Sequence, residues 1–115
     1  MSRYKGCIVE ESLEDFRAIN GLKIVRVRIT EEDNPSERWH IYDSLVSEKE
    51  INKLHGQLKQ SWYMHFWNDE KIMILFKDKR FEFDIDNKES WKPAIDYGIS
   101  LGIPKEQLDF EMEFN

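Results

Sequence analysis

The sequence predicts an α+β fold, a mostly antiparallel sheet of about five strands with two main helices packed on one face. Two observations lead to this prediction. Runs that alternate apolar and polar residues follow one another through short turns, as neighbouring antiparallel strands do. Two stretches with helical spacing of apolar residues come between and after these runs, which gives the order ββαβββα. The 115 residues, 40% of them hydrophobic, suit a single domain over residues 1–115 that fills its own core.

The first two strands are expected in LKIVRVRIT (22–30) and RWHIYDS (38–44). The connector between them, EEDNPSE (31–37), is polar and carries an Asn-Pro turn signal. We therefore predict a hairpin with a long loop. In its first strand two sets of side chains alternate: Val25, Val27 and Ile29 on one face, and Ile24, Arg26 and Arg28 on the other.

A helix is predicted over residues 47–58. Ser47 and Glu50 have the spacing of a capping box, in which each side chain accepts a hydrogen bond from the backbone N–H of the other residue. Ile51, Leu54 and Leu58 form its apolar face.

Three more strands are expected at 62–67, 71–77 and 80–85, joined by short polar turns. The last strand alternates strictly, which is typical of an edge or a solvated face. The two before it are apolar on both sides, which is typical of the middle of a sheet. In SWYMHFWND (61–69), Trp62 and Phe66 are expected to face the helices, and Tyr63, His65 and Trp67 the opposite side.

The second helix is predicted over residues 90–102, with Gly102 as its left-handed cap and Pro104 preventing continuation. A short helical turn and an acidic tail are expected over 104–115. The N-terminal segment, residues 1–20, is assigned a strand at Cys7–Glu10 and a short helix at Leu13–Ile19.

Helices on one face leave the other face of the sheet to be covered by the N-terminal segment, the C-terminal tail, a second copy or a ligand. Rings and arginines are concentrated on binding surfaces, and arginine binds carboxylates and phosphates bidentately. Structural stacking of the arginines on the rings is the alternative explanation. The candidate ligand-binding residues are Tyr63, His65, Trp67, His40, Tyr42, Arg26 and Arg28.

His40 and His65 could lie on one face of the sheet and act as acid and base, or bind a metal with Asp43, Glu82 or Cys7 as third ligand. Their spacing is not diagnostic, and strand histidines are more often packed or half-exposed. We therefore predict no catalytic residue, no metal ligand and no cofactor.

The net charge of −6 is unevenly distributed: residues 1–60 carry ten bases and eleven acids, residues 61–115 seven bases and twelve acids. A duplex-binding protein needs a basic stripe, and none is visible, so we expect neither a nucleic acid nor an anionic membrane as partner. No apolar run approaches the ~18 residues that span a bilayer. The single cysteine, Cys7, excludes an internal disulfide and is consistent with a cytoplasmic location.

Two stretches carry a family resemblance: SWYMHFWND with KIMILFKDKRFEF, and SWKPAIDYGISLGIPKEQLDF. Over Lys23 to Phe110 the chain resembles a family of small uncharacterised bacterial proteins. The resemblance implies a self-contained domain and supplies no activity, ligand or catalytic residue.

From these observations we expect a non-enzymatic domain that binds a small ligand or a protein through the aromatic sheet face, as a monomer or homodimer. Two alternatives stay open. One is a small cytoplasmic enzyme with acid–base or metal chemistry at His65 and His40. The other is a structural homodimer whose sheet faces or edge strands pair.

Overall fold

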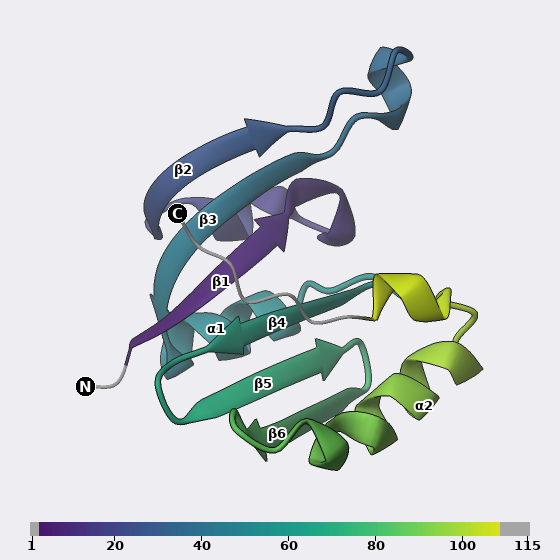
Figure 1. Cartoon of the computed structure of the whole chain (residues 1–115). Coiled ribbons are helices and arrows are strands. Elements are labelled where there is room, and N and C mark those ends of the chain that lie inside the picture. The colour runs from purple at the N-terminus through teal and green to yellow at the C-terminus, as the bar shows by residue number, and fades with distance from the viewer. Residues whose placement is uncertain (1–2, 109–115) are drawn as a thin grey trace.

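The computed structural model describes residues 3–108 and confirms the α+β fold. One antiparallel sheet has six strands in the order β2-β3-β1-β4-β5-β6 (Figure 1). The strands are β1 (Arg3–Val9), β2 (Lys23–Ile29), β3 (His40–Ser47), β4 (Tyr63–Trp67), β5 (Lys71–Phe76) and β6 (Lys79–Asp84). The helices are α1 (Glu48–His55) and α2 (Lys92–Ser100), with the short 3-10 helices η1 (Glu10–Ser12), η2 (Phe16–Ile19), η3 (Pro35–Glu37), η4 (Lys88–Trp91) and η5 (Lys105–Gln107).

The strand that the sequence does not predict in full, β1, lies in the middle of the sheet and pairs with both β3 and β4. Tyr4 and Ile8 are buried on one of its faces. Between them stands Gly6, which pairs with Phe66 of β4, and a Cβ added to Gly6 would overlap the Phe66 ring. The Phe66 ring thus occupies the space that a side chain at residue 6 would fill. Because residue 6 is a glycine, the sequence of β1 does not show the alternation of apolar and polar residues that is typical of a strand.

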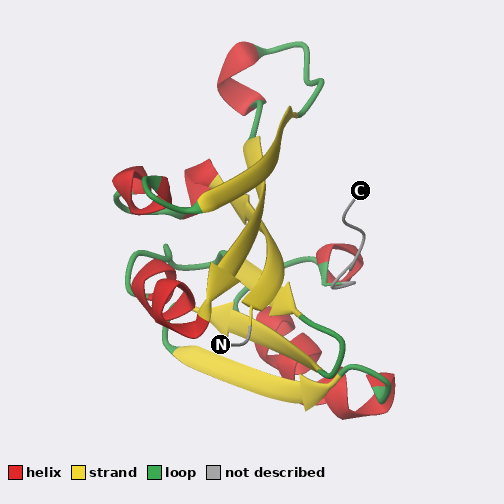
Figure 2. Cartoon of the chain, turned by 90° about the vertical axis from the view of Figure 1, so that its left-hand side faces the viewer, coloured by secondary structure: helices red, strands yellow, loops and turns green. Residues whose placement is uncertain are grey.

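The two helices cover opposite faces of the sheet, and the predicted placement of both on one face is therefore wrong (Figure 2). The α1 face, as we call it, carries Ile8 and Phe66, and the α2 face carries Cys7 and Trp67. The reason is that β4 and β5 carry apolar side chains on both faces of the sheet, so both faces must be packed against other elements.

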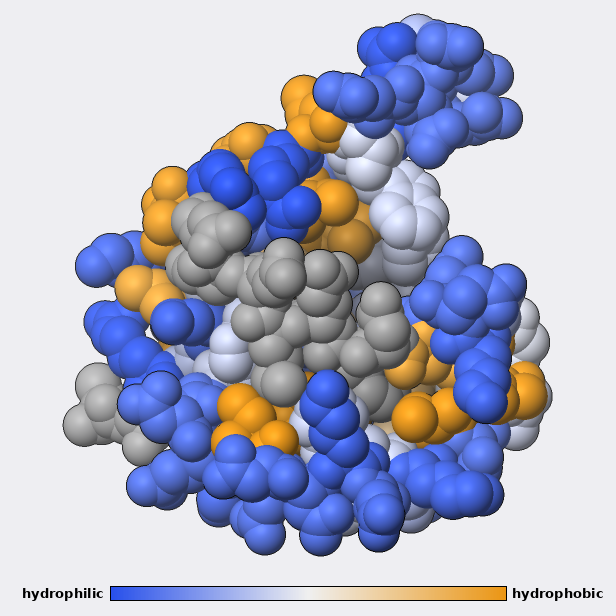
Figure 3. Space-filling model, viewed as in Figure 1, coloured by the Kyte–Doolittle hydropathy of each residue, from blue (hydrophilic) through white to orange (hydrophobic). Residues whose placement is uncertain are grey.

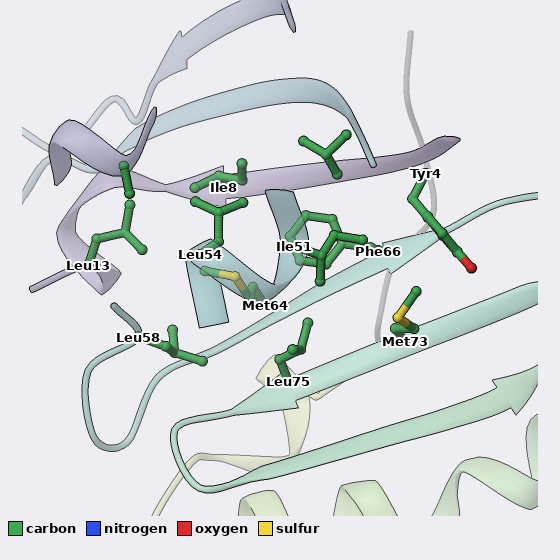
Figure 4. Packing of buried hydrophobic residues seen from close by; sticks show 12 residues of the cluster. Tyr4, Ile8, Leu13, Ile51, Leu54, Leu58, Met64, Phe66, Met73 and Leu75 are labelled. Atoms are coloured by element: carbon green, nitrogen blue, oxygen red, sulfur yellow. The ribbon is translucent and has the colours of Figure 1, made fainter. Parts of the chain in front are cut away.

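On the α1 face, helix α1 packs against β1, β4 and β5, as Figure 4 shows. The predicted capping box is present: Ser47 Oγ accepts from the Glu50 N–H at 3.2 Å, and Glu50 accepts from the Ser47 N–H at 2.9 Å. Burial of a residue such as Ile51 or Leu54 contributes roughly 2 kcal/mol. The buried residues of this core are Tyr4, Ile8, Leu13, Ala18, Val46, Ile51, Leu54, Leu58, Met64, Phe66, Met73 and Leu75.

On the α2 face, a second core joins helix α2 and the segment after it to β4 and β5. Gly102 ends the helical segment with a φ of +89°, as predicted. The predicted helical turn after Pro104 is η5, and Leu108 beyond it packs against Gly98 of α2. The acidic tail, residues 109–115, lies outside the described residues. The buried residues of this core are Trp67, Ile72, Ile74, Phe76, Trp91, Ala94, Ile103 and Leu108.

The sheet ends in β6 on one side, as predicted for a half-exposed strand, and in β2 on the other. Although the apolar residues of LKIVRVRIT suit a core strand, all of β2 except the half-buried Ile24 is exposed. Together β2 and the start of β3 extend beyond the rest of the sheet as an arm with η3 at its tip (Figure 1). Among residues 3–108, no helix is long and apolar enough to cross a membrane.

Candidate functional site

The candidate residues divide between the two faces of the sheet. His40 precedes Tyr42 by two positions on β3, and Tyr42 pairs with Ile8 and so lies on the α1 face. His65 lies between Tyr63 and Trp67 on β4, which both pack in the α2-face core. His40 and His65 therefore lie on opposite sides of the sheet, and this placement excludes one acid–base or metal site built from both imidazoles.

Tyr63, His65 and Trp67 form a row of stacked rings along β4. The Tyr63 and His65 centroids lie 6.2 Å apart, and those of His65 and Trp67 lie 5.3 Å apart. Trp67 is buried, and the Tyr63 hydroxyl donates a hydrogen bond to the carbonyl of Gln107 after α2. The row is anchored in the second core at both ends, so its contribution to packing is established, whereas ligand binding by it stays a prediction.

Arg26 and Arg28 share the α2 face with Asp43 of β3, and both bind its carboxylate. Arg26 Nε and Arg28 Nη2 each lie 2.8 Å from an Asp43 oxygen. Asp43 is fully buried, whereas the two arginine side chains keep 41% and 42% of their surface exposed. Two guanidinium groups share one carboxylate, so the three side chains together keep a net positive charge at the surface.

The Cys7 thiol is the third donor to Asp43, at a distance of 3.2 Å from Sγ. Burial raises the pKa of Asp43, but hydrogen bonds from Arg28, Cys7 and Arg26 outweigh it and hold this pKa below its usual value. Burial and the neighbouring carboxylate raise the pKa of Cys7 to about 12. The thiol is therefore a hydrogen-bond donor rather than a nucleophile.

The side chains of β2 separate by chemistry between its two faces. A β-bulge between Ile24 and Arg26 shifts the register, so that Ile24 shares a face with Val27 and Ile29 instead of with the arginines as predicted. Val27 and Ile29 are 52% and 54% exposed. On the α2 face the strand carries three cations, Lys23, Arg26 and Arg28.

Among the described residues, Arg26 and Arg28 are held in place by their ion pairs with Asp43 and not by stacking on Trp39, Tyr42 or Trp67. Trp39 instead lies edge-on to Trp62, with ring centroids 5.1 Å apart. Figure 3 shows hydrophilic and hydrophobic side chains side by side along the arm that carries β2.

On the α1 face, His40 and Tyr42 contact two glutamates of η1. His40 Nδ1 lies 2.7 Å from a Glu11 oxygen, and this contact raises the pKa of His40. The Tyr42 hydroxyl donates to Glu10 at 2.8 Å.

Sequence reasoning named Asp43 only as a possible metal ligand and not as the partner of Arg26 and Arg28, and it did not single out Glu10 and Glu11. One signal for Asp43 was available, because aspartate is rare inside strands and here stands between the apolar residues of IYDSLV. No comparable signal marks Glu10 and Glu11, whose partners are about thirty residues away.

No family model, curated protein or solved structure matches the chain. The resemblance of residues 23–110 to small bacterial proteins accordingly stays an expectation.

Proposed function

We propose that the chain is a non-enzymatic protein-interaction domain that binds an extended acidic segment of a partner protein as a seventh strand beside β2. One observation carries the proposal: β2 is an exposed edge strand of seven residues with cations on one face and apolar side chains on the other. Strand addition of this kind takes its affinity from main-chain hydrogen bonds and its specificity from the alternate side chains.

The backbone of β2 has hydrogen-bonding groups that face away from β3. The Thr30 N–H donates to the Trp39 carbonyl, and Arg28 lies opposite Ile41 two residues further along the ladder. Antiparallel pairs alternate between bonded and non-bonded, so Arg28 is bonded to β3 and Val27 is not. The N–H and C=O groups of Val27 and Ile29 therefore point to the open edge, where an added strand would bond them.

The side chains of β2 specify the chemistry of that strand. Its neighbours on the α2 face would be Arg26 and Arg28, which favour carboxylates. Its neighbours on the α1 face would be Val27 and Ile29, which favour apolar residues. Successive residues of a strand point to opposite faces, so the expected partner alternates acidic and apolar residues.

A second copy of β2 fits this edge poorly. In an antiparallel pair centred on Val27, the valines would match well, but Arg26 of each copy would face Arg28 of the other. Like charges directly opposite one another destabilise a strand pair. Charge complementarity therefore favours a heterologous acidic segment over pairing of two β2 strands.

The proposal is tested with the fluorescently labelled peptide EVEVEVE and its charge-reversed form KVKVKVK, by fluorescence anisotropy. We expect saturable binding of the acidic peptide and at least tenfold weaker binding of the basic one. Val27→Pro removes the outward N–H without removing a bond to β3, and is expected to weaken binding of the acidic peptide at least tenfold. Val27→Thr keeps both the N–H and the branched shape and serves as the matched control.

Equal binding of the acidic peptide by the wild type and by Val27→Pro would contradict strand addition. If Arg26→Gln and Arg28→Gln then abolished binding, the arginine pair alone would be the binding site and the edge of β2 would have no part in it.

A further inference from the structure

Glu10, Glu11 and His40 converge on the α1 face, where β1 ends and β3 begins. One ligand atom from each, a carboxylate oxygen or an imidazole nitrogen, lies within 4.8 Å of the other two. The three residues come from two elements: the glutamates are the first two residues of η1, and the histidine is the first of β3. None of them takes part in the proposed strand addition.

In each carboxylate one oxygen accepts a hydrogen bond, and the other oxygen faces the imidazole. Tyr42 Oη donates to Glu10 Oε1 at 2.8 Å, and the backbone N–H of His40 donates to Glu11 Oε1 at 2.9 Å. The other oxygens, Oε2 of Glu10 and of Glu11, lie 3.8 Å and 2.7 Å from His40 Nδ1. Tyr42 is outside the set of ligands, and its hydrogen bond orients the Glu10 carboxylate as outer partners orient the ligands of metal sites.

An ordinary ion pair explains only part of this arrangement. The Nδ1–H of a protonated His40 is bonded by Glu11 alone, because Glu10 Oε2 at 3.8 Å is beyond hydrogen-bond distance. Within residues 3–108, neither lysine nor arginine forms an ion pair with Glu10 or Glu11. The fold therefore holds two carboxylates close together with a single neutralising group that carries at most one charge.

We propose that Glu10, Glu11 and His40 bind a divalent first-row transition metal ion, with zinc as the reference ion. The ligand atoms are Oε2 of both glutamates and Nδ1 of the histidine, at the usual lengths of about 2.0–2.2 Å, with water in the remaining position. Imidazole favours such an ion over calcium or magnesium, which prefer oxygen ligands. The ion displaces the proton shared by His40 and Glu11, which is released to solvent, and the 2.7 Å contact between them opens to make room.

The site fastens η1 to the first residue of β3, at the base of the arm. His40 pairs with Ile29, the last residue of β2, so a bound ion ties the arm to the end of β1. Because such an ion binds the folded chain and not the unfolded one, it raises the melting temperature in a concentration-dependent way.

The test is a titration of the metal-free full chain with Zn²⁺ in competition with a chromophoric chelator, repeated with Co²⁺ to read its visible absorption. The variants are Glu10→Gln, Glu11→Gln and His40→Gln, which keep side-chain size and remove one ligand each. Glu14→Gln is the matched control, because it makes the same charge change three residues away at an exposed position. Circular dichroism melting of each variant without metal reports whether it is folded.

We expect one high-affinity equivalent, an affinity reduced at least tenfold in each of the three variants, and no change in Glu14→Gln. The proposal is overturned if zinc does not bind, or if all variants bind as the wild type does, since the ion is then held elsewhere. It is also overturned if only one folded variant of the three loses affinity, because the ion then does not require this set of ligands.

Discussion

Asp43 is fully buried and ionised, and three side chains from two neighbouring strands donate hydrogen bonds to its carboxylate. The arrangement keeps Arg26 and Arg28 side by side on one face of the exposed strand. It also determines the chemistry of Cys7, because a thiol that donates to a carboxylate loses its proton with difficulty. At this scale, one carboxylate organises both the proposed binding surface and an unreactive cysteine.

The Cys7 thiol is expected to react slowly with iodoacetamide. Its pKa is about 12 instead of the ordinary 9.0, so at pH 8 the thiolate fraction is roughly 1000-fold smaller than for a free cysteine. Mass spectrometry of the folded and the urea-unfolded chain measures both rates. Similar rates in the two states would contradict the described environment of the thiol.

Asp43→Asn is expected to lower the free energy of unfolding by about 2 kcal/mol at pH 7, because two guanidinium groups lose their partner. Because the arginine side chains are partly hydrated, this loss of stability is smaller than the loss expected when a fully buried ion pair is broken. Since folding lowers the pKa of Asp43, its stabilisation is complete above the unfolded-state pKa of 3.8 and is lost as the pH falls from there through the lower folded-state pKa.

The measurement is urea unfolding of the wild type and of Asp43→Asn from pH 7 to pH 2.5. The difference between the two free energies is expected to shrink below pH 3.8. A difference that stays constant over this range would show that the charge of Asp43 does not contribute.

Among the elements, β1 shows how a glycine determines the packing of a central strand. Gly6 lies under the ring of Phe66, and the two residues are paired across β1 and β4. Because Gly6 has no side chain, the ring lies against the backbone at a place where the Cβ of any other residue would displace it. This close approach joins the arm side of the sheet to its β4–β6 side.

Gly6→Ala is expected to lower the free energy of unfolding by about 2–3 kcal/mol, because the added methyl group overlaps the Phe66 ring in a closely packed core. Gly56→Ala is the control: the same group meets only ordinary contacts after α1, where the backbone is helical, and is expected to stabilise by up to about 1 kcal/mol. Urea denaturation measures both, and equal effects would contradict the account of Gly6.

Much of this architecture was predictable at the element scale, because local patterns decide it. The capping box at Ser47, the cap at Gly102 and the apolar strands β4 and β5 all follow from residues a few positions apart. The placement of α2 did not follow, since the spacing of its apolar residues shows that one side is buried but not against which face of the sheet.

The candidate site was less predictable, because its contacts join distant residues. The arginines of β2 were predicted as candidate ligand-binding residues, but the bulge at Val25 changes which apolar residues share a face. Asp43 lies fifteen or more positions from either arginine, and Glu10 and Glu11 about thirty from their partners. Periodicity within a strand contains no information on such pairs.

For the whole molecule, the sheet has two parts with different roles. Between β1 and β6, helices α1 and α2 and the short helices other than η3 cover it from both sides and form two cores. At the other end, β2 continues the sheet with charged and apolar faces that neither core buries. The proposed metal ion lies where these parts meet, and the proposed partner strand extends the sheet beyond β2.

Hydrogen exchange of individual β2 amides, followed by NMR with and without the peptide EVEVEVE, tests the central claim most directly. In the free protein, we expect fast exchange at Val27 and Ile29, whose N–H groups face the open edge, and slow exchange at Arg26 and Arg28, which bond to β3. Saturating peptide should slow exchange at Val27 and Ile29 at least tenfold. Unchanged exchange at both residues in the peptide-saturated protein would contradict the account.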